Sequence, residues 1–212
     1  MITRWPLVLA SGSARRAAML REAGYSPILE AADIDDATVV LETQSPRALT
    51  LALALFKVRR VEAARRNRGA DTAVILGADT MCAVDGDLIG KPDTVAHAES
   101  MIRAFEGRAH EVVTAWCIAA PDGTRVLEVD CAIVHLDPLT HTQRSAHLAA
   151  GAWRGKAGGY NYPEAIAAGW PLRCEGLWET VVGLPLVRIA PALTKALACG
   201  SVSQVQPAGE IT

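Results

Sequence analysis

The chain has 212 residues, which suits one domain, or one domain with a small additional lobe. Its 21 basic and 23 acidic residues nearly balance at a formal net charge of −2, which argues against a general electrostatic affinity for nucleic acid. No apolar run is long enough to span a membrane, and the N-terminal segment lacks the apolar body of a signal peptide. We therefore expect a cytoplasmic protein that binds neither nucleic acid nor membrane.

The five cysteines are an odd number without a CxxC pair, and the five histidines show no HExxH spacing. This pattern indicates scattered thiols in a reducing cytoplasm, not a disulfide framework or a zinc site. Any bound metal should therefore have oxygen ligands, which indicates Mg²⁺ or Mn²⁺.

The first predicted elements are a strand over residues 6–10, a loop of small residues and a helix over residues 14–23. The amides at a helix N-terminus favour an anion. Arg15 and Arg16 lie in the first turn, where cations are unfavourable unless an anion offsets them. The pattern predicts an anion site; the alternative is two solvated arginines.

A second strand over residues 27–31 leads to an acidic segment with Asp33, Asp35 and Asp36. Three carboxylates within four residues can gather a hard cation, although acidic loops are usually only solvated.

The helix predicted over residues 45–66 begins with Ser-Pro. It carries Leu49, Leu53 and Phe56 at helical spacing, so we expect that stripe to face a sheet. Lys57 lies beside the stripe, where it can either reach a pocket or extend to solvent.

Residues 73–76 form an apolar run bounded by Gly77, so we predict a short buried strand that ends there and releases Asp79 from the core. A hairpin over residues 81–89 follows, and it leads to Lys91 between a glycine and a proline. Ligands collect beyond the carboxyl ends of strands in open α/β sheets, so this carboxylate and lysine indicate a metal and a phosphate. The alternative is that Asp79 caps a turn and Lys91 is a solvated charge.

The rest of the chain alternates helices and hairpins. Residues 151–162 are rich in glycine with interleaved aromatic residues, which suits a base or a sugar but is also typical of a surface loop. The other expected elements are helices at 93–106, 140–150 and from 184 onward, and hairpins at 110–136 and 172–182.

A series of motifs in one order resembles the Maf family, the septum-formation-inhibitor proteins that are nucleoside triphosphate pyrophosphatases. The motifs are LVLASGSARR, DIDD, SPRALTLALALFKV, ILGADT, IGKP, GRAHEVVT, GKAGGY and VVGLPLVRI. The resemblance implies an α/β fold related to the inosine triphosphatases, with an elongated mixed sheet flanked by helices and an active-site cleft between two lobes. It also implies a homodimer that hydrolyses a nucleoside triphosphate to the monophosphate and pyrophosphate with a divalent cation. We expect residues 1–199 to form this single domain and residues 200–212 to form a disordered tail.

The resemblance also assigns roles to residues at the matching motif positions. Asp79 would be the catalytic carboxylate, and Asp36 would help it to hold the metal. Lys91 near Asp79 should favour the charged form of that carboxyl group. The implied phosphate ligands are Ser11, Arg15, Arg16, Lys57 and Lys91.

The chain departs from the family pattern at several positions. Asp36 stands where glutamate is usual, Gly155 replaces the aspartate of a DKAG motif, and residues 161–164 replace a segment that usually contains glutamine. We expect this loop to contact the base, through Tyr160, Tyr162 and Glu164. A rival hypothesis is a catalytically weak nucleotide-binding regulator of cell division that acts through a protein partner.

Overall fold

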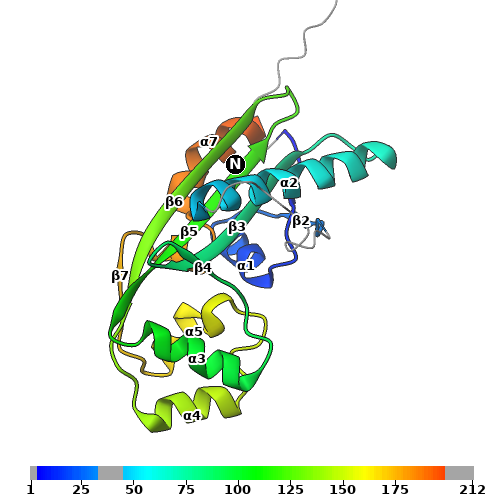
Figure 1. Ribbon diagram of the computed structural model, residues 1–212. Helices are drawn as coiled ribbons and strands as arrows, with labels where there is room; N and C mark the ends of the chain where they lie inside the picture. Colours follow the sequence, from blue (N-terminus) through cyan, green and yellow to red (C-terminus); the bar gives the residue numbers. More distant parts are fainter. Residues whose placement is uncertain (1–3, 33–44, 199–212) are drawn as a thin grey trace, which may run out of the picture.

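The computed structural model describes residues 4–32 and 45–198 (Figure 1). One mixed sheet with strand order β2-β1-β3-β5-β6-β7 runs through the molecule, and β4 also pairs with β3. The two N-terminal pairings, β1 with β2 and β1 with β3, are parallel, and the other pairings are antiparallel. The strands are β1 (Leu7–Leu9), β2 (Ile28–Leu29), β3 (Val74–Val84), β4 (Asp87–Ile89), β5 (Arg108–Ala119), β6 (Arg125–Leu136) and β7 (Leu172–Glu175).

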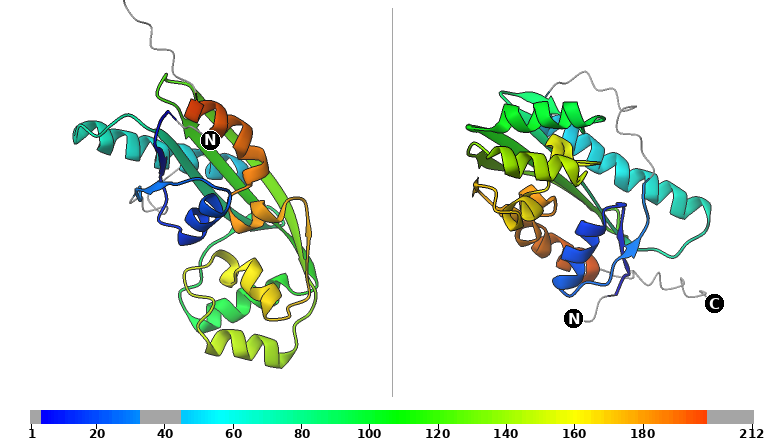
Figure 2. Two further views of the ribbon diagram at one scale, coloured as in Figure 1. Left: turned by 180° about the vertical axis from the view of Figure 1, so that it is seen from behind. Right: turned by 90° about the horizontal axis from the view of Figure 1, so that it is seen from below.

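Helices cover both faces of this sheet and form a second lobe at one end, which confirms the predicted mixed sheet flanked by helices (Figures 1 and 2). In the upper lobe α2 covers one face, and α1 and α7 pack on the other. The lower lobe contains α3, α4 and α5. The helices are α1 (Ala14–Glu22), α2 (Pro46–Asn67), α3 (Val95–Phe105), α4 (His141–Ala149), α5 (Tyr162–Ala167), α6 (Trp178–Val182), α7 (Leu186–Ala198) and the 3₁₀ helix η2 (Ala157–Gly159).

The two faces of the upper sheet have separate apolar cores, and alternation along β3 assigns its residues to them. Val74, Leu76 and Ala78 pack toward α1 and α7, whereas Ile75 packs toward α2. Gly77 and Asp79 follow Ile75 at spacings of two, so they lie on the α2 face, and Thr80 lies on the opposite face.

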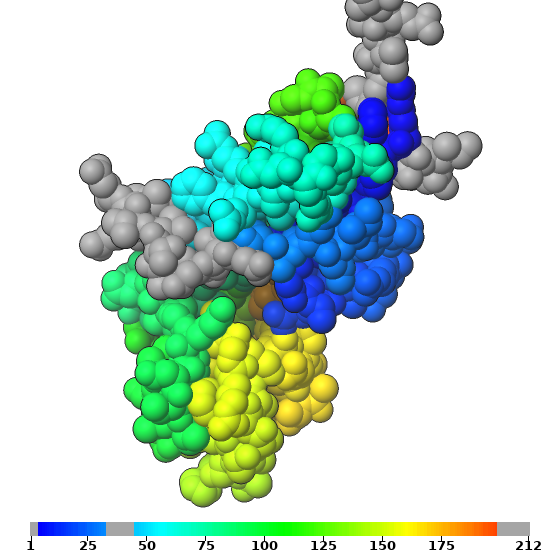
Figure 3. Space-filling model, turned by 90° about the vertical axis from the view of Figure 1, so that its right-hand side faces the viewer, coloured from blue at the N-terminus to red at the C-terminus, as the bar shows by residue number. Residues whose placement is uncertain are grey.

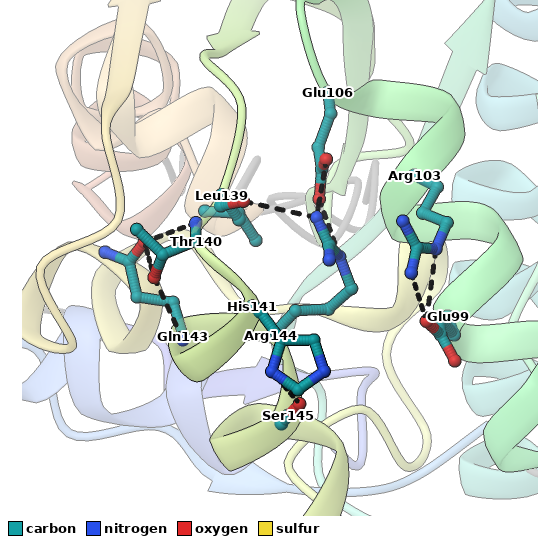
Figure 4. Close-up of polar contacts among 9 residues, drawn as sticks. All are labelled: Glu99, Arg103, Glu106, Leu139, Thr140, His141, Gln143, Arg144 and Ser145. Atoms are coloured by element: carbon teal, nitrogen blue, oxygen red, sulfur yellow. Dashed lines mark hydrogen bonds and ion pairs between the residues drawn. The ribbon is translucent and has the colours of Figure 1, made fainter.

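A buried ion pair ties the helices of the lower lobe together (Figure 4). The Arg144 guanidinium on α4 donates to both carboxylate oxygens of Glu106, at the end of α3, with N···O distances of 2.7–2.9 Å. It also donates to the carbonyl of Leu139 at 3.2 Å. Thr140 begins α4 as the first residue of a capping box with Gln143. These contacts fix α4 against the end of α3 and so stabilise the packing of the lower lobe.

Three expectations about local structure are wrong. The strand over residues 73–76 does not end at Gly77: β3 continues to Val84, because β5 pairs with it from Ile75 to Ala83. Asp79 is therefore buried within a strand and does not emerge from its end.

The apolar stripe proposed for α2 is also rotated from the true one. Of the predicted stripe Leu53 is buried, but Phe56 is exposed, and the other buried positions are Ala54, Val58 and Val61, with Thr50 and Arg65. Gly77 on β3 lets this face of α2 approach the sheet closely at Ala54 and Val58.

The second strand of the hairpin at 172–182 is a helix. β7 pairs with β6, but Trp178–Val182 forms α6, which ends at Gly183 with a φ of 105°. The β-branched residues of this segment favour a strand locally, but the left-handed glycine and the Gly183 N–H bond to the Glu179 carbonyl end a helical turn here.

Among the described helices, none has the length and apolar character needed to cross a membrane. The acidic segment with Asp33, Asp35 and Asp36 lies outside the described residues, and so does the expected tail over residues 200–212.

Candidate functional site

The strand registers leave a gap along one edge of β3. β1 pairs with β3 as far as Leu76, and β4 pairs with β3 from Cys82 onward. Because β5 occupies the other edge of β3, β1 and β4 must share this edge. On this edge, residues 77–81 of β3 therefore lie between the end of β1 and the end of β4 with no described strand beside them, whereas β5 pairs with them on the other edge. At the gap, Asp79 and Thr80 point to opposite faces of the sheet.

On the α2 face, Lys57 forms an ion pair with Asp79, and both side chains are largely buried. Gly77 makes this pairing possible, because a Cβ atom there would lie 2.7 Å from Val58 Cγ2 and 2.9 Å from the Ala54 carbonyl oxygen. The helix thus approaches the strand closely at the turn that carries Lys57. The sequence predicts Lys91 as the charge partner of Asp79. In the structure Lys57 forms this ion pair, and Lys91 is exposed on the loop after β4.

On the opposite face, contacts with Gly183, Thr80 and Ser11 hold Arg16 at the gap. Its Nε donates to the Gly183 carbonyl at 2.8 Å, and its terminal nitrogens donate to Thr80 Oγ1 at 2.9 Å and to Ser11 Oγ at 3.2 Å. Ser13 caps α1 by accepting the Arg16 amide. The strand, loop and helix predicted as an anion site are thus confirmed as elements, and they carry Arg16 to the edge of β3.

Arg15 on α1 and Glu164 on α5 interact electrostatically, although they belong to different lobes. Partial burial lowers the pKa of Arg15, and the negative charge of Glu164 on α5 opposes that shift. Glu164 also forms an ion pair with Lys156. Figure 3 shows a hollow between α1 (blue) and the green and yellow segments of the lower lobe. This hollow lies between the two lobes, where the predicted architecture places a cleft.

The glycine-rich segment forms the wall of the lower lobe, held by three contacts. The Gly158 N–H donates to the Gly90 carbonyl at 3.0 Å, which ties the segment to the loop of Lys91. His147 Nε2 lies 2.8 Å from the Gly159 carbonyl oxygen. The Tyr160 hydroxyl lies 2.7 Å from His110 Nε2. The position of Lys91 therefore depends on packing within the lower lobe.

Of the proposed base contacts, Tyr160 is the most deeply buried. Its ring packs against Phe105 and Trp170, and burial raises its pKa well above the ordinary value. Tyr162 is half-buried at the start of α5, and Glu164 is exposed in the first turn of that helix. Glu164 and Tyr162 thus have side chains closer to solvent than Tyr160.

Sequence reasoning missed the histidines and threonines that support these positions. Burial, with a smaller contribution from His135, lowers the pKa of His110 to about 4, so this ring is neutral at pH 7. His110, Thr80 and Thr114 lie in ordinary strand patterns, and no spacing in the sequence distinguishes them from other core residues. Of these residues, only Thr80 belongs to a quoted motif, ILGADT, in which it directly follows the candidate aspartate.

The described residues do not by themselves complete a metal site. In residues 4–32 and 45–198, no group of three or more His, Cys, Asp and Glu side chains is arranged to hold a metal ion. Asp79 provides a carboxylate at the gap, and Asp36, its expected partner, lies outside this part of the chain.

Comparison with known proteins decides the family. The sequence profile described as "Maf-like protein" matches residues 6–196, which include every strand and helix given above except the last two residues of α7. The chain belongs to the Maf family.

Curated relatives in the Maf family match most of this chain. A protein from Granulibacter bethesdensis is 39% identical over 199 residues, covering 90% of this chain and 93% of its own. One from Caulobacter vibrioides is 39% identical over 184 residues, covering 85% and 90%. One from Rhizobium meliloti is 37% identical over 182 residues, covering 85% and 87%. Each of the three is named dTTP/UTP pyrophosphatase.

Two solved structures show a more distant likeness. The Staphylococcus aureus Ham1 protein has a TM-score of 0.40 and 16% identity, and the match covers 62% of this chain and 71% of that one. A nucleoside triphosphatase, or dITP/XTP pyrophosphatase, from Mycobacterium abscessus has a TM-score of 0.35 and 18% identity, covering 62% and 74%.

Proposed function

We propose that this Maf-family chain hydrolyses a nucleoside triphosphate to the monophosphate and pyrophosphate, and that dTTP and UTP are its first candidate substrates. The observation that carries the proposal is the gap in the sheet, where Asp79 with Lys57 lies on one face and Arg16 on the other. The names of the curated relatives support the substrate class.

Asp79 is the proposed catalytic residue. A water molecule attacks a phosphorus atom of the α–β anhydride, the bond from that phosphorus to the bridging oxygen breaks, and pyrophosphate and the monophosphate separate. A carboxylate beside the water can orient it and accept its proton. Lys57 stands next to this carboxylate and offers a cation to the charge that develops on phosphate.

The triphosphate carries several negative charges, and we propose that cations from both sides of the cleft bind them. Arg16 is already fixed by its contacts, so it loses little freedom when phosphate arrives. Arg15 lies on the first turn of α1, and Lys91 follows β4. Ser11 completes this set of phosphate ligands, which also includes Lys57.

A divalent cation, Mg²⁺ or Mn²⁺, belongs to the same proposal. When bound it would neutralise phosphate charge. We assign Asp79 and Asp36 as its protein ligands. A carboxylate pair suits these hard cations better than any thiol or imidazole of the described residues does. Titration of Mn²⁺ into the wild type and into Asp36→Asn tests this assignment.

For the base, we propose the wall formed by Tyr160, Tyr162 and Glu164. The charge of Glu164 on the lower lobe acts on Arg15, a proposed phosphate ligand, which supports a place for Glu164 near the substrate. Changing Glu164 to Gln should alter the ranking of bases more than turnover on the best one. Equal losses on every base would make this segment purely structural.

The deciding experiment is to incubate the purified protein with a panel of triphosphates and Mg²⁺ or Mn²⁺, and to assay pyrophosphate. We expect pyrophosphate and monophosphate in equal amounts. Orthophosphate alone would indicate a phosphatase, and tight nucleotide binding without turnover would favour the regulator of cell division. We propose further that residues 1–199 act as one domain in a cytoplasmic homodimer; light scattering tests the dimer.

A further inference from the structure

Behind Arg16, two threonine hydroxyl groups form a chain of hydrogen bonds from β3 to β5 on one face of the sheet. The Arg16 guanidinium donates to Thr80 Oγ1 at 2.9 Å, and Thr80 Oγ1 lies 2.8 Å from Thr114 Oγ1, its cross-strand partner on β5. Thr114 Oγ1 donates to the Thr180 carbonyl at 2.7 Å. Thr114 and Thr180 are both fully buried, at 0% exposed. The chain of contacts thus runs from the cleft into the core.

The direction of these hydrogen bonds is fixed. A hydroxyl group has one hydrogen to donate, and a carbonyl oxygen can only accept. Because Thr114 donates its hydrogen to the Thr180 carbonyl, it must accept from Thr80. Thr80 therefore gives its own hydrogen to Thr114 and presents lone pairs to Arg16. Thr80 can accept from Arg16 because Thr114 donates its own hydrogen to the Thr180 carbonyl and is therefore an acceptor for Thr80.

Helix α6 provides the fixed end of the chain and a second contact for Arg16. Carbonyl groups in the last turn of a helix have no helical partner. Here Thr114 bonds the carbonyl of Thr180, and Arg16 Nε bonds the carbonyl of Gly183. The Thr180 hydroxyl in turn donates to Asp130 Oδ2 on β6 at 2.6 Å. One short helix therefore determines the position of Arg16 both directly and through the threonines.

We propose that Thr114 is a positioning residue for phosphate binding, which holds Arg16 at the gap through the hydroxyl group of Thr80. The inference rests on the proposed function, in which Arg16 binds the triphosphate. A buried threonine 0% exposed touches no substrate, so its effect must pass through Arg16. Without the Thr114 acceptor, Thr80 can turn its hydrogen toward the guanidinium, and the two donors then repel one another.

The test compares Thr114→Val, which keeps the shape, with Thr114→Ser, which keeps the hydroxyl. The readouts are KM and kcat for UTP, and the affinity for its non-hydrolysable α,β-methylene analogue. We expect Thr114→Val to weaken analogue binding and raise KM about five- to tenfold, the worth of one hydrogen bond, with a smaller change in kcat. Thr114→Ser should stay within about twofold of the wild type.

A double-mutant cycle separates positioning from simple loss of stability. In an Arg16→Ala background, Thr114→Val should weaken analogue binding by less than about twofold, since the guanidinium it positions is gone. Thr50→Val is the matched control, because Thr50 is also a buried threonine and its hydroxyl donates to the Pro46 carbonyl within α2. The control should lose stability and keep the wild-type KM.

Each outcome has one meaning. If Arg16→Ala leaves analogue affinity unchanged, the phosphate role of Arg16 in the proposed function fails. If Arg16→Ala weakens binding but Thr114→Val has no effect, or has its full effect in both backgrounds, the positioning role of Thr114 is wrong. Should Thr114→Val fail to fold, Thr80→Val removes the hydroxyl group through which Thr114 acts on Arg16, and it takes the place of Thr114→Val in the cycle.

Discussion

Lys57 on α2 and Asp79 on β3 form an ion pair that closes one face of the sheet gap, with side chains only 14% and 8% exposed. A buried pair of this kind is costly to break, because removing one partner leaves the other charge without compensation. The carboxylate is therefore held in one place before any substrate arrives. That arrangement suits a group that must orient a water molecule.

The first prediction concerns Asp79→Asn, which keeps the size of the side chain and removes its basicity. Turnover should fall by about 10²–10⁴, the usual contribution of a positioned general base. Affinity for the α,β-methylene analogue of UTP should hold or rise, because one negative charge near the phosphates is gone. Turnover and analogue affinity are measured side by side with saturating metal.

Stability is part of the same test. The amide oxygen of the new side chain would still accept from Lys57, so the variant should fold, but Lys57 loses its counter-charge and the free energy of unfolding should fall by about 3 kcal/mol. Asp85→Asn is the matched control, since Asp85 pairs with Arg108 in the exposed turn after β3. Near-normal turnover in Asp79→Asn would remove this residue from the mechanism.

The second prediction is a loss of stability in mild acid that depends on His110. Burial lowers the pKa of this ring from 6.5 to about 4, so between these pH values the unfolded chain binds a proton that the folded protein does not. The free energy of unfolding should therefore fall as pH drops below about 6.5, by about 2 kcal/mol at pH 5. Urea denaturation at pH 7.5 and pH 5 measures the change.

The variant His110→Gln isolates this contribution. Other groups titrate in the same range, but they do so in both proteins. The wild type should lose about 2 kcal/mol more than the variant between the two pH values. Equal losses would show that His110 takes up its proton in the folded protein.

The third prediction uses the two arginine–glutamate pairs of the lower lobe (Figure 4). Arg144 and Glu106 are 9% and 14% exposed, whereas Arg103 and Glu99, one turn apart on α3, are 54% and 39% exposed. Arg144→Met should lower the free energy of unfolding by about 3–5 kcal/mol, because Glu106 stays buried without its partner. Arg103→Met should change it by less than about 1 kcal/mol. Denaturant titration compares the two, and similar effects would contradict the assignment.

The sequence predicts some parts of this site and not others, for physical reasons. Local signals sufficed for the hairpin at Asp85 and Gly86, whose φ values of 51° and 89° are those that an Asp-Gly turn requires. The family resemblance, which the comparisons confirm, identified Asp79, Lys57 and Arg16 as candidate site residues. The length of β3 was not predictable locally, because pairing with β5 carries the strand through Gly77.

Contacts between distant segments account for the other misses. Arg16 meets Gly183 across 167 positions, and Thr114 meets Thr180 across 66, so no local pattern reveals either pair. The strand predicted at residues 178–182 failed for the same reason: its helix is supported by Thr114 on β5 and by Arg16 on α1. Asp36 lies outside the described residues, so its role stays a prediction.

The last prediction concerns Gly77, which sets the distance between α2 and the gap. A Cβ atom there would lie 2.7 Å from Val58 Cγ2 and 2.9 Å from the Ala54 carbonyl oxygen, so Gly77→Ala must push the helix away from the strand. Overpacking of this kind costs about 1–3 kcal/mol. Because Lys57 is next to Val58, the same shift should pull its ammonium group from Asp79 and lower kcat about tenfold or more, the effect of a small misplacement.

Two further variants show whether the effect on kcat comes from the helix position. Gly90→Ala, where a Cβ atom meets nothing within 4 Å, should leave the free energy of unfolding unchanged or slightly higher. Val58→Ala combined with Gly77→Ala removes the closest clash but not the one with the Ala54 carbonyl, so it should recover part of the lost kcat. A Gly77→Ala protein with wild-type kcat and reduced stability would mean that the Lys57–Asp79 pair tolerates movement of α2. The close approach of helix and strand would then contribute to core packing and not to catalysis.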